Sequence, residues 1–205
     1  MRRVLFRAAV SALLALGMLL HGAARAQDIE VRDAALHAVE DGLALDADFD
    51  FELTPRLADV VANGVPLYFL VEFQLTRPRW YWFEERTADR RLQLRLSYHA
   101  LSRQYRLSTG PLHQSFPTLG EALNVLKRVR NWVVVERSIG LSDADYEAAV
   151  RMRLDTTLLP KPFQLSALTS REMHLESAWK RFTVRAPAHL PAPVETREQK
   201  GGMDR

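Results

Sequence analysis

The stretch DGLALDADFDFE, residues 41–52, shows the pattern that decides the fold. From Leu43 to Glu52 apolar side chains take every second position, and acidic side chains fill most positions between them. A period of two is typical of a β-strand with one face in the core and the other in solvent. Asp41-Gly42 is a hairpin turn signal, so we expect this strand to pair with an earlier strand near residues 29–39.

The same alternation recurs in residues 92–100 and 146–154, which we also expect to be half-buried strands. Residues 65–75, VPLYFLVEFQL, instead begin with apolar side chains at both odd and even positions. Such a pattern favours a central strand that is covered on both faces.

Two segments carry helix signals. Thr54-Pro55 supplies an N-cap followed by proline at the first helical position, and Asn63-Gly64 supplies a stop. Thr118 and Glu121 form a capping box, after which apolar residues share one helical face until about Asn131.

The segment LPKPFQL, residues 159–165, places Pro160 and Pro162 on either side of Lys161. Proline has no N–H for a ladder, so we expect an extended segment at a sheet edge or between sheets. The alternative is a polyproline segment that is presented to a partner groove.

Several antiparallel strands with two helices predict a mainly β protein, an antiparallel β-sandwich with two short peripheral helices. The alternative is an α+β antiparallel sheet with helices on one face. The length suits a single domain, which we place at residues 27–185.

The N-terminus has the three parts of a secretory signal peptide over residues 1–26. Arginines come first, an apolar run over residues 8–20 follows, and Ala24-Arg25-Ala26 is an A-x-A cleavage site. The apolar run is too short for a spanning helix, so we expect cleavage before Gln27, export to the periplasm and no transmembrane segment in the mature chain. Residues 186–205 are rich in proline and charge, which predicts a disordered tail.

Removal of the signal peptide changes the charge. The full chain has a net charge of +3, but residues 27–205 hold 24 basic and 25 acidic residues. We find no basic stripe of the kind that nucleic acid requires, and therefore expect no nucleic-acid binding. The chain contains no cysteine, which excludes thiolate catalysis and disulfide staples.

Four strings resemble an uncharacterised family of exported proteobacterial proteins, domain-of-unknown-function family 4390. They are WYWF at 80–83, LSYHALSRQYRLS at 96–108, LPKPFQL at 159–165 and the Ser177/Trp179 pair. The resemblance covers about residues 28–185. It implies a Gram-negative periplasmic setting and an association with a membrane sensor kinase of the nitrogen-regulation type, and it transfers no functional residue.

No catalytic motif is present. The chain lacks a G-x-S-x-G elbow and an H-E-x-x-H helix. His99 shares a strand face with Ser97, as His113 does with Ser115, but a polar outer strand face explains both pairs better than a dyad. We therefore name no catalytic residue and expect no cofactor.

The acidic row Asp46, Asp48, Asp50 and Glu52 points to one side of its strand. Calcium needs 6–8 converging oxygens, which a flat row does not provide alone. We favour cross-strand pairing with arginines over a metal site, and note arginine-bearing faces at Arg95, Arg151 and Arg153.

The stretch RPRWYWFEER, residues 77–86, contains four aromatic rings in a row. We expect it to continue the strand that ends near Leu75, with EERTADRR, residues 84–91, as a charged connection. The core accommodates one aromatic pair, and the other pair is then covered or exposed. If it is exposed, Arg77, Arg79, Trp80 and Trp82 are the candidate binding residues, because tryptophan and arginine dominate interface hot spots.

These observations predict a non-enzymatic periplasmic binding or accessory domain linked to an envelope sensor kinase. The alternative is a glycan-binding or glycan-acting protein of the cell wall, in which the rings stack on sugars. The partner is accordingly an envelope protein or a cell-wall glycan.

Overall fold

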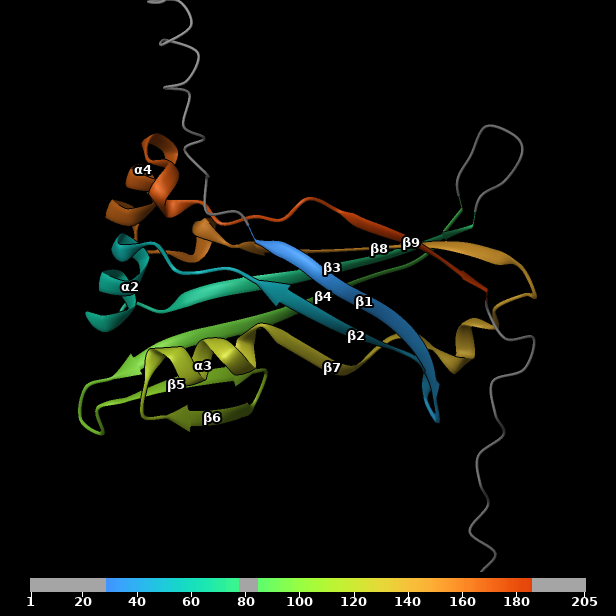
Figure 1. Ribbon diagram of the computed structural model, residues 1–205, viewed down its shortest axis with the longest axis horizontal. Coiled ribbons are helices and arrows are strands. Elements are labelled where there is room, and N and C mark those ends of the chain that lie inside the picture. The colour runs from blue at the N-terminus through green and yellow to red at the C-terminus, as the bar shows by residue number, and fades with distance from the viewer. Residues whose placement is uncertain (1–28, 78–84, 186–205) are drawn as a thin grey trace, which may run out of the picture.

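The computed structural model describes residues 29–77 and 85–185. Within these residues the chain is mainly β-strand, arranged in two antiparallel sheets with three α-helices near their ends (Figure 1). The strands are β1 (Glu30–Val39), β2 (Gly42–Asp50), β3 (Leu67–Arg77), β4 (Glu85–His99), β5 (Gln104–Thr109), β6 (Leu112–Phe116), β7 (Arg128–Glu136), β8 (Asp145–Leu154) and β9 (Lys180–Arg185). The helices are α2 (Pro55–Ala62), α3 (Leu119–Leu126) and α4 (Lys161–Thr169), with 3-10 turns at Arg137–Ile139, Thr156–Leu158 and Arg171–Met173.

The smaller sheet has the strand order β1-β2-β7. β1 and β2 form the hairpin that the sequence predicts, closing at the pair Val39↔Gly42. The alternation along β2 gives the expected burial, since Leu43, Leu45, Ala47 and Phe49 are all less than 5 % exposed. This hairpin is confirmed.

The larger sheet has the order β6-β5-β4-β3-β8-β9. β3 lies between β4 and β8, so the expected central strand is confirmed. Leu70 and Glu72 are buried on one face of β3, and Phe69 and Phe73 are fully buried on the other. The expected connection over residues 84–91 is wrong, because β4 begins at Glu85 and pairs with β3 from Arg77 onward.

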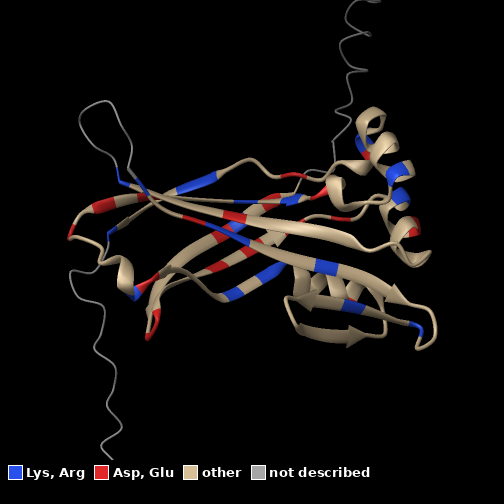
Figure 2. Ribbon diagram, turned by 180° about the vertical axis from the view of Figure 1, so that it is seen from behind, with Lys and Arg blue, Asp and Glu red and all other residues tan. Residues whose placement is uncertain are grey.

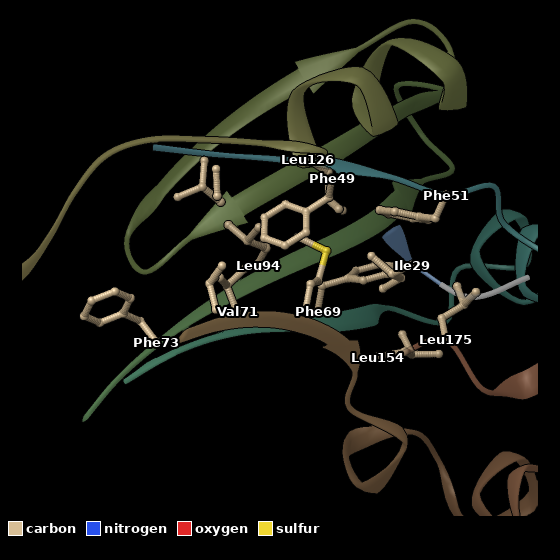
Figure 3. Close-up of a cluster of buried hydrophobic side chains, with 14 of the residues drawn as sticks. Ile29, Phe49, Phe51, Phe69, Val71, Phe73, Leu94, Leu126, Leu154 and Leu175 are labelled. Atoms are coloured by element: carbon tan, nitrogen blue, oxygen red, sulfur yellow. The ribbon is translucent and has the colours of Figure 1, made fainter. Parts of the chain in front are cut away.

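The core lies between the two sheets. Phe69, Val71 and Phe73 of β3 meet Phe49 of β2 in one buried cluster, to which Leu94 of β4 also belongs (Figure 3). Each strand contributes alternate residues to this cluster because successive side chains point to opposite faces. The larger sheet therefore has an inner face towards β1, β2 and β7 and an outer face turned away from them.

Helix α2 occupies the segment that the sequence predicts. The Thr54 hydroxyl accepts a hydrogen bond from the Leu57 N–H at 3.1 Å and donates one to the Glu172 carbonyl at 2.7 Å. The Thr118 cap of α3 is also present, with Glu121 N–H to Thr118 Oγ1 at 3.2 Å. However, α3 ends at Leu126, five residues before the expected end at Asn131. The predicted end of this helix is wrong because β7 begins at Arg128 and pairs with β2.

The extended segment expected at residues 159–165 is also wrong, because this region forms the start of α4. Pro160 is the N-cap of α4 and Pro162 lies in its first turn. The first N–H groups of a helix have no intrahelical acceptor, so proline loses nothing there. The Gln164 side chain further fixes this turn by donating to the Thr157 and Leu159 carbonyls, each at 2.7 Å.

The predicted class, a mainly β protein of antiparallel sheets with few helices, is confirmed. α4 is an addition to the two helices expected. None of the helices in the described ranges is long and apolar enough to cross a membrane.

Candidate binding surface

The outer face of the larger sheet is rich in arginine. Cross-strand register places on it Arg91, Arg95, Arg106, Arg151, Arg153 and Arg181, from β4, β5, β8 and β9. Arg91, Gln93 and Arg95 are exposed, so this face is open along β4. Figure 2 shows lysine and arginine positions in blue along the strands of the larger sheet.

Glu72 of β3 is the carboxylate at the middle of this face, and its side chain is only 8 % exposed. Its Oε2 accepts from Arg151 Nε at 2.7 Å and from Arg153 Nε at 3.3 Å. Arg91 Nε lies 3.5 Å from Oε1. The three arginines come from both neighbouring strands, because Glu72 pairs with Arg91 in β4 and with Arg151 in β8. One buried carboxylate therefore holds three guanidinium groups in place.

The Glu72 cluster continues to the edge of the sheet. Arg151 Nη1 donates to Glu176 Oε1 at 2.7 Å, and its guanidinium lies 4.6 Å from the centre of the Trp179 ring. Ser177 is buried, and its Oγ accepts a hydrogen bond from the Met152 N–H of the same strand at 3.0 Å. The Ser177/Trp179 pair thus fixes the segment before β9 against β8.

A polar hollow of about 450 Å³ lies at the β4–β5–β6 end of the same face. Its lining includes Tyr68, Arg95, His99, Arg106 and His113, together with Ser97 and Ser108, and contains no carboxylate. The Arg95 guanidinium lies 6.0 Å from the centre of the Tyr68 ring. Such a lining can donate hydrogen bonds to an anion, and it contains no carboxylate that would neutralise the charge of Arg95 and Arg106.

Among the described residues, His99 forms no hydrogen bond with Ser97, and His113 forms none with Ser115. His99 Nδ1 lies 3.0 Å from Ser102 Oγ, and it accepts from the Ser102 N–H at 3.3 Å. His99 pairs across the sheet with Gln104, whereas Ser97 pairs with Arg106. The register therefore supports the interpretation that these histidines and serines belong to a polar outer face of the sheet.

Two carboxylates of the acidic row, Asp48 and Asp50, pair with basic side chains of neighbouring elements, and these partners are not the arginines named from the sequence. Arg130 bonds Asp48 at 2.5 Å, Lys127 bonds Asp50 at 3.2 Å, and Arg32 also bonds Asp50. The hydrogen bond from Lys127 is the main reason that the pKa of the Asp50 carboxyl lies below its usual value; desolvation opposes this effect and Arg32 adds to it. Arg151 and Arg153 instead serve Glu72.

Of the candidate residues from the aromatic stretch, only Arg77 lies within the described residues. Arg77 is the last residue of β3, is half-buried and pairs with Glu85. Arg79, Trp80 and Trp82 lie outside the described residues, as does the expected tail over residues 186–205.

Sequence reasoning missed the convergence on the outer face. A signal for it was present, because residues 90–120 contain five arginines and two histidines but no aspartate or glutamate. Register was needed to convert this bias into a surface, since Tyr68, Arg95, Ser108 and His113 are neighbours only across four strands.

Fold and surface together define a two-sheet antiparallel β protein with an arginine-rich outer sheet face. The family model described as domain of unknown function (DUF4390) matches residues 26–183, and the chain belongs to this family. No curated protein and no solved structure matches the chain significantly.

Proposed function

We propose that the protein is a non-enzymatic periplasmic binding or accessory domain that serves an envelope sensor kinase. The observation that carries this proposal is the outer face of the larger sheet, which presents arginines held in place around the buried Glu72. Pre-oriented arginines are common at binding surfaces because less side-chain freedom is lost when the partner binds.

The polar side chains of the face support binding rather than catalysis. A histidine base is oriented by an acid in nucleophilic sites, and the hollow around His99 and His113 is lined without any carboxylate. The periplasmic location rests on the signal peptide pattern of residues 1–26.

The aromatic stretch supplies a second contact region at the Arg77 end of β3. Trp80 and Trp82 beside Arg77 and Arg79 have the composition of an interface hot spot. We expect W80A/W82A to leave the free energy of unfolding within about 0.5 kcal/mol per substitution. The same variant should lose capture of an inner-membrane or periplasmic partner, because truncation of a hot spot costs about 2 kcal/mol or more.

The experiment is capture by the immobilised protein from periplasm and solubilised inner membrane, with chemical denaturation of each variant. L165A/L168A is the matched control, because these α4 leucines are 67 % and 81 % exposed and lie on a different element. Wild type and control should capture the same partner. A loss of about 3–5 kcal/mol in W80A/W82A would instead show that the tryptophans are core residues, and would end the proposed role of this stretch.

Glycan binding is the second candidate function. The half-buried Tyr68 ring beside Arg95 favours it, because an aromatic face in a polar hollow suits a sugar. Co-sedimentation with peptidoglycan tests this candidate: pelleting of the wild type, without capture of any protein, would replace the first function by the second.

A further inference from the structure

The hollow at the β4–β5–β6 end of the outer face carries the positive charge of Arg95 and Arg106 without a carboxylate in its lining. Apart from Gly64 and Tyr68, its lining comes from the segment 90–120, which contains no acidic residue. Elsewhere on this face carboxylates accompany the arginines: Glu72 serves Arg91, Arg151 and Arg153, and Glu147 serves Arg181. The hollow has no such partner among its lining residues.

Strand register explains how the donors converge. Tyr68, Arg95, Ser108 and His113 form one row across β3, β4, β5 and β6. Ser97 and Arg106 begin the next row, two residues further along β4 and β5. Residues two apart on a strand point to the same face, so both rows open to the same side of the sheet. Arg95 and Arg106 therefore lie diagonally across one strand pair.

These two arginines have no ion-pair partner in the part of the chain that the structure describes. Arg106 is also half-buried, and its Nε is a buried donor without a hydrogen-bond acceptor. A buried donor without an acceptor costs free energy, about 1–3 kcal/mol for an ordinary group. An anionic ligand in the hollow would supply the missing acceptor.

The imidazoles add donors at the rim. His99 accepts from the Ser102 N–H at Nδ1, which leaves Nε2 as the nitrogen that carries the proton of the neutral ring. His113 is exposed and lies beside Ser108 in the register of β5 and β6. The hollow also offers two guanidinium groups and two serine hydroxyls. A ligand carboxylate has only two oxygens, too few to accept hydrogen bonds from all of these donors with good geometry.

We infer that this hollow binds a phosphate group, either on a free small molecule or on a lipid headgroup. A phosphate has three terminal oxygens, and arginine binds it through paired, charge-assisted hydrogen bonds. The volume of about 450 Å³ lies in the usual range of small-molecule sites. The inference rests on the proposed binding function, for which it names the ligand class.

The test is calorimetric titration of the purified protein with inorganic phosphate in a buffer of low ionic strength. We expect saturable binding by the wild type and an affinity lower by roughly tenfold or more in R95Q/R106Q, since charge-assisted bonds to phosphate are lost. R181Q/R185Q is the matched control, because it removes the same charge from β9 of the same sheet. Its affinity should remain within about twofold of the wild type.

Absence of saturable binding by the wild type, or equal weakening by both double variants, would overturn the inference. If R95Q/R106Q does not fold, the imidazole NMR signals of the wild type decide. Phosphate should shift the signals of His99 and His113 and leave those of His37 and His174 unchanged. Shifts at all four histidines, or at none, would contradict a site in the hollow.

A second arm separates the two sources of phosphate. Vesicles of phosphatidylcholine with and without phosphatidylglycerol are sedimented with the same three proteins. Binding that requires phosphatidylglycerol and both Arg95 and Arg106 identifies a lipid headgroup, whereas binding of inorganic phosphate alone identifies a soluble compound. The proposed function fails separately, when neither protein capture nor peptidoglycan co-sedimentation occurs although phosphate binds.

Discussion

At the scale of single residues, Glu72 determines how the arginines of the outer face are arranged. An isolated carboxylate with 8 % exposure would be strongly disfavoured, but Arg91, Arg151 and Arg153 surround it. The arginines depend on Glu72 in turn, because without it three like charges would meet at the centre of the sheet. The sequence shows the apolar run of β3 with one glutamate inside it, yet the partners of that glutamate become visible only with the register of β4 and β8.

This dependence predicts the effect of E72Q. The amide keeps the shape of the side chain but removes the negative charge, so we expect the free energy of unfolding to fall by about 1–3 kcal/mol. E147Q is the matched control, since Glu147 pairs with Arg181 on the same face but its side chain is 51 % exposed. Its effect should stay within about 0.5 kcal/mol. Equal losses in urea denaturation of the two variants would show that burial of Glu72 adds nothing.

At the scale of elements, the sequence predicts those that local patterns define. The β1–β2 hairpin, α2 and the central strand β3 are present because alternation, caps and turn residues agree there. The end of α3 was not predictable in this way: Val129 fits the helical period, but the N–H of Phe49 bonds the Lys127 carbonyl at 2.8 Å and β7 starts beside β2. The two prolines of α4 fit both an extended segment and a first helical turn, and contacts with Gln164 favour the helix.

The pairing of β2 with β7 gives a prediction at Gly42. This residue has φ +146°, and a Cβ added to it would lie 1.9 Å from the Val135 carbonyl oxygen. We expect G42A to lower the free energy of unfolding by at least about 2 kcal/mol, because backbone strain and a backbone clash combine. G64A is the control, since Gly64 has φ +86° but no atom within 4 Å of its added Cβ. It should cost about 1 kcal/mol, and equal losses in the two variants would contradict the close approach of the strands.

At the scale of the whole molecule, the fold class follows from local alternation, whereas the binding surface does not. Alternation specifies which side chains face the core, so a two-sheet β protein can be predicted without knowing which strands are neighbours. The hollow needs the order β6-β5-β4-β3, which brings Tyr68 and His113 into one row from positions 45 residues apart. Sequence separation of this kind leaves no local periodic signal. Only the missing acidic residues between Asp89 and Glu121 indicate the surface in advance.

Export is the remaining prediction at this scale. Ile29 is 3 % exposed in the core, and its N–H bonds the Glu176 carbonyl at 3.3 Å. Cleavage before Gln27 therefore removes no residue of the described core, and the mature chain should fold as the full chain does. Intact-mass measurement of the exported protein should give residues 27–205. A24L/A26L should retain residues 1–26, because the cleavage site requires small residues at both positions. A wild-type protein that reaches the periplasm with residues 1–26 still attached would show that the segment is an anchor.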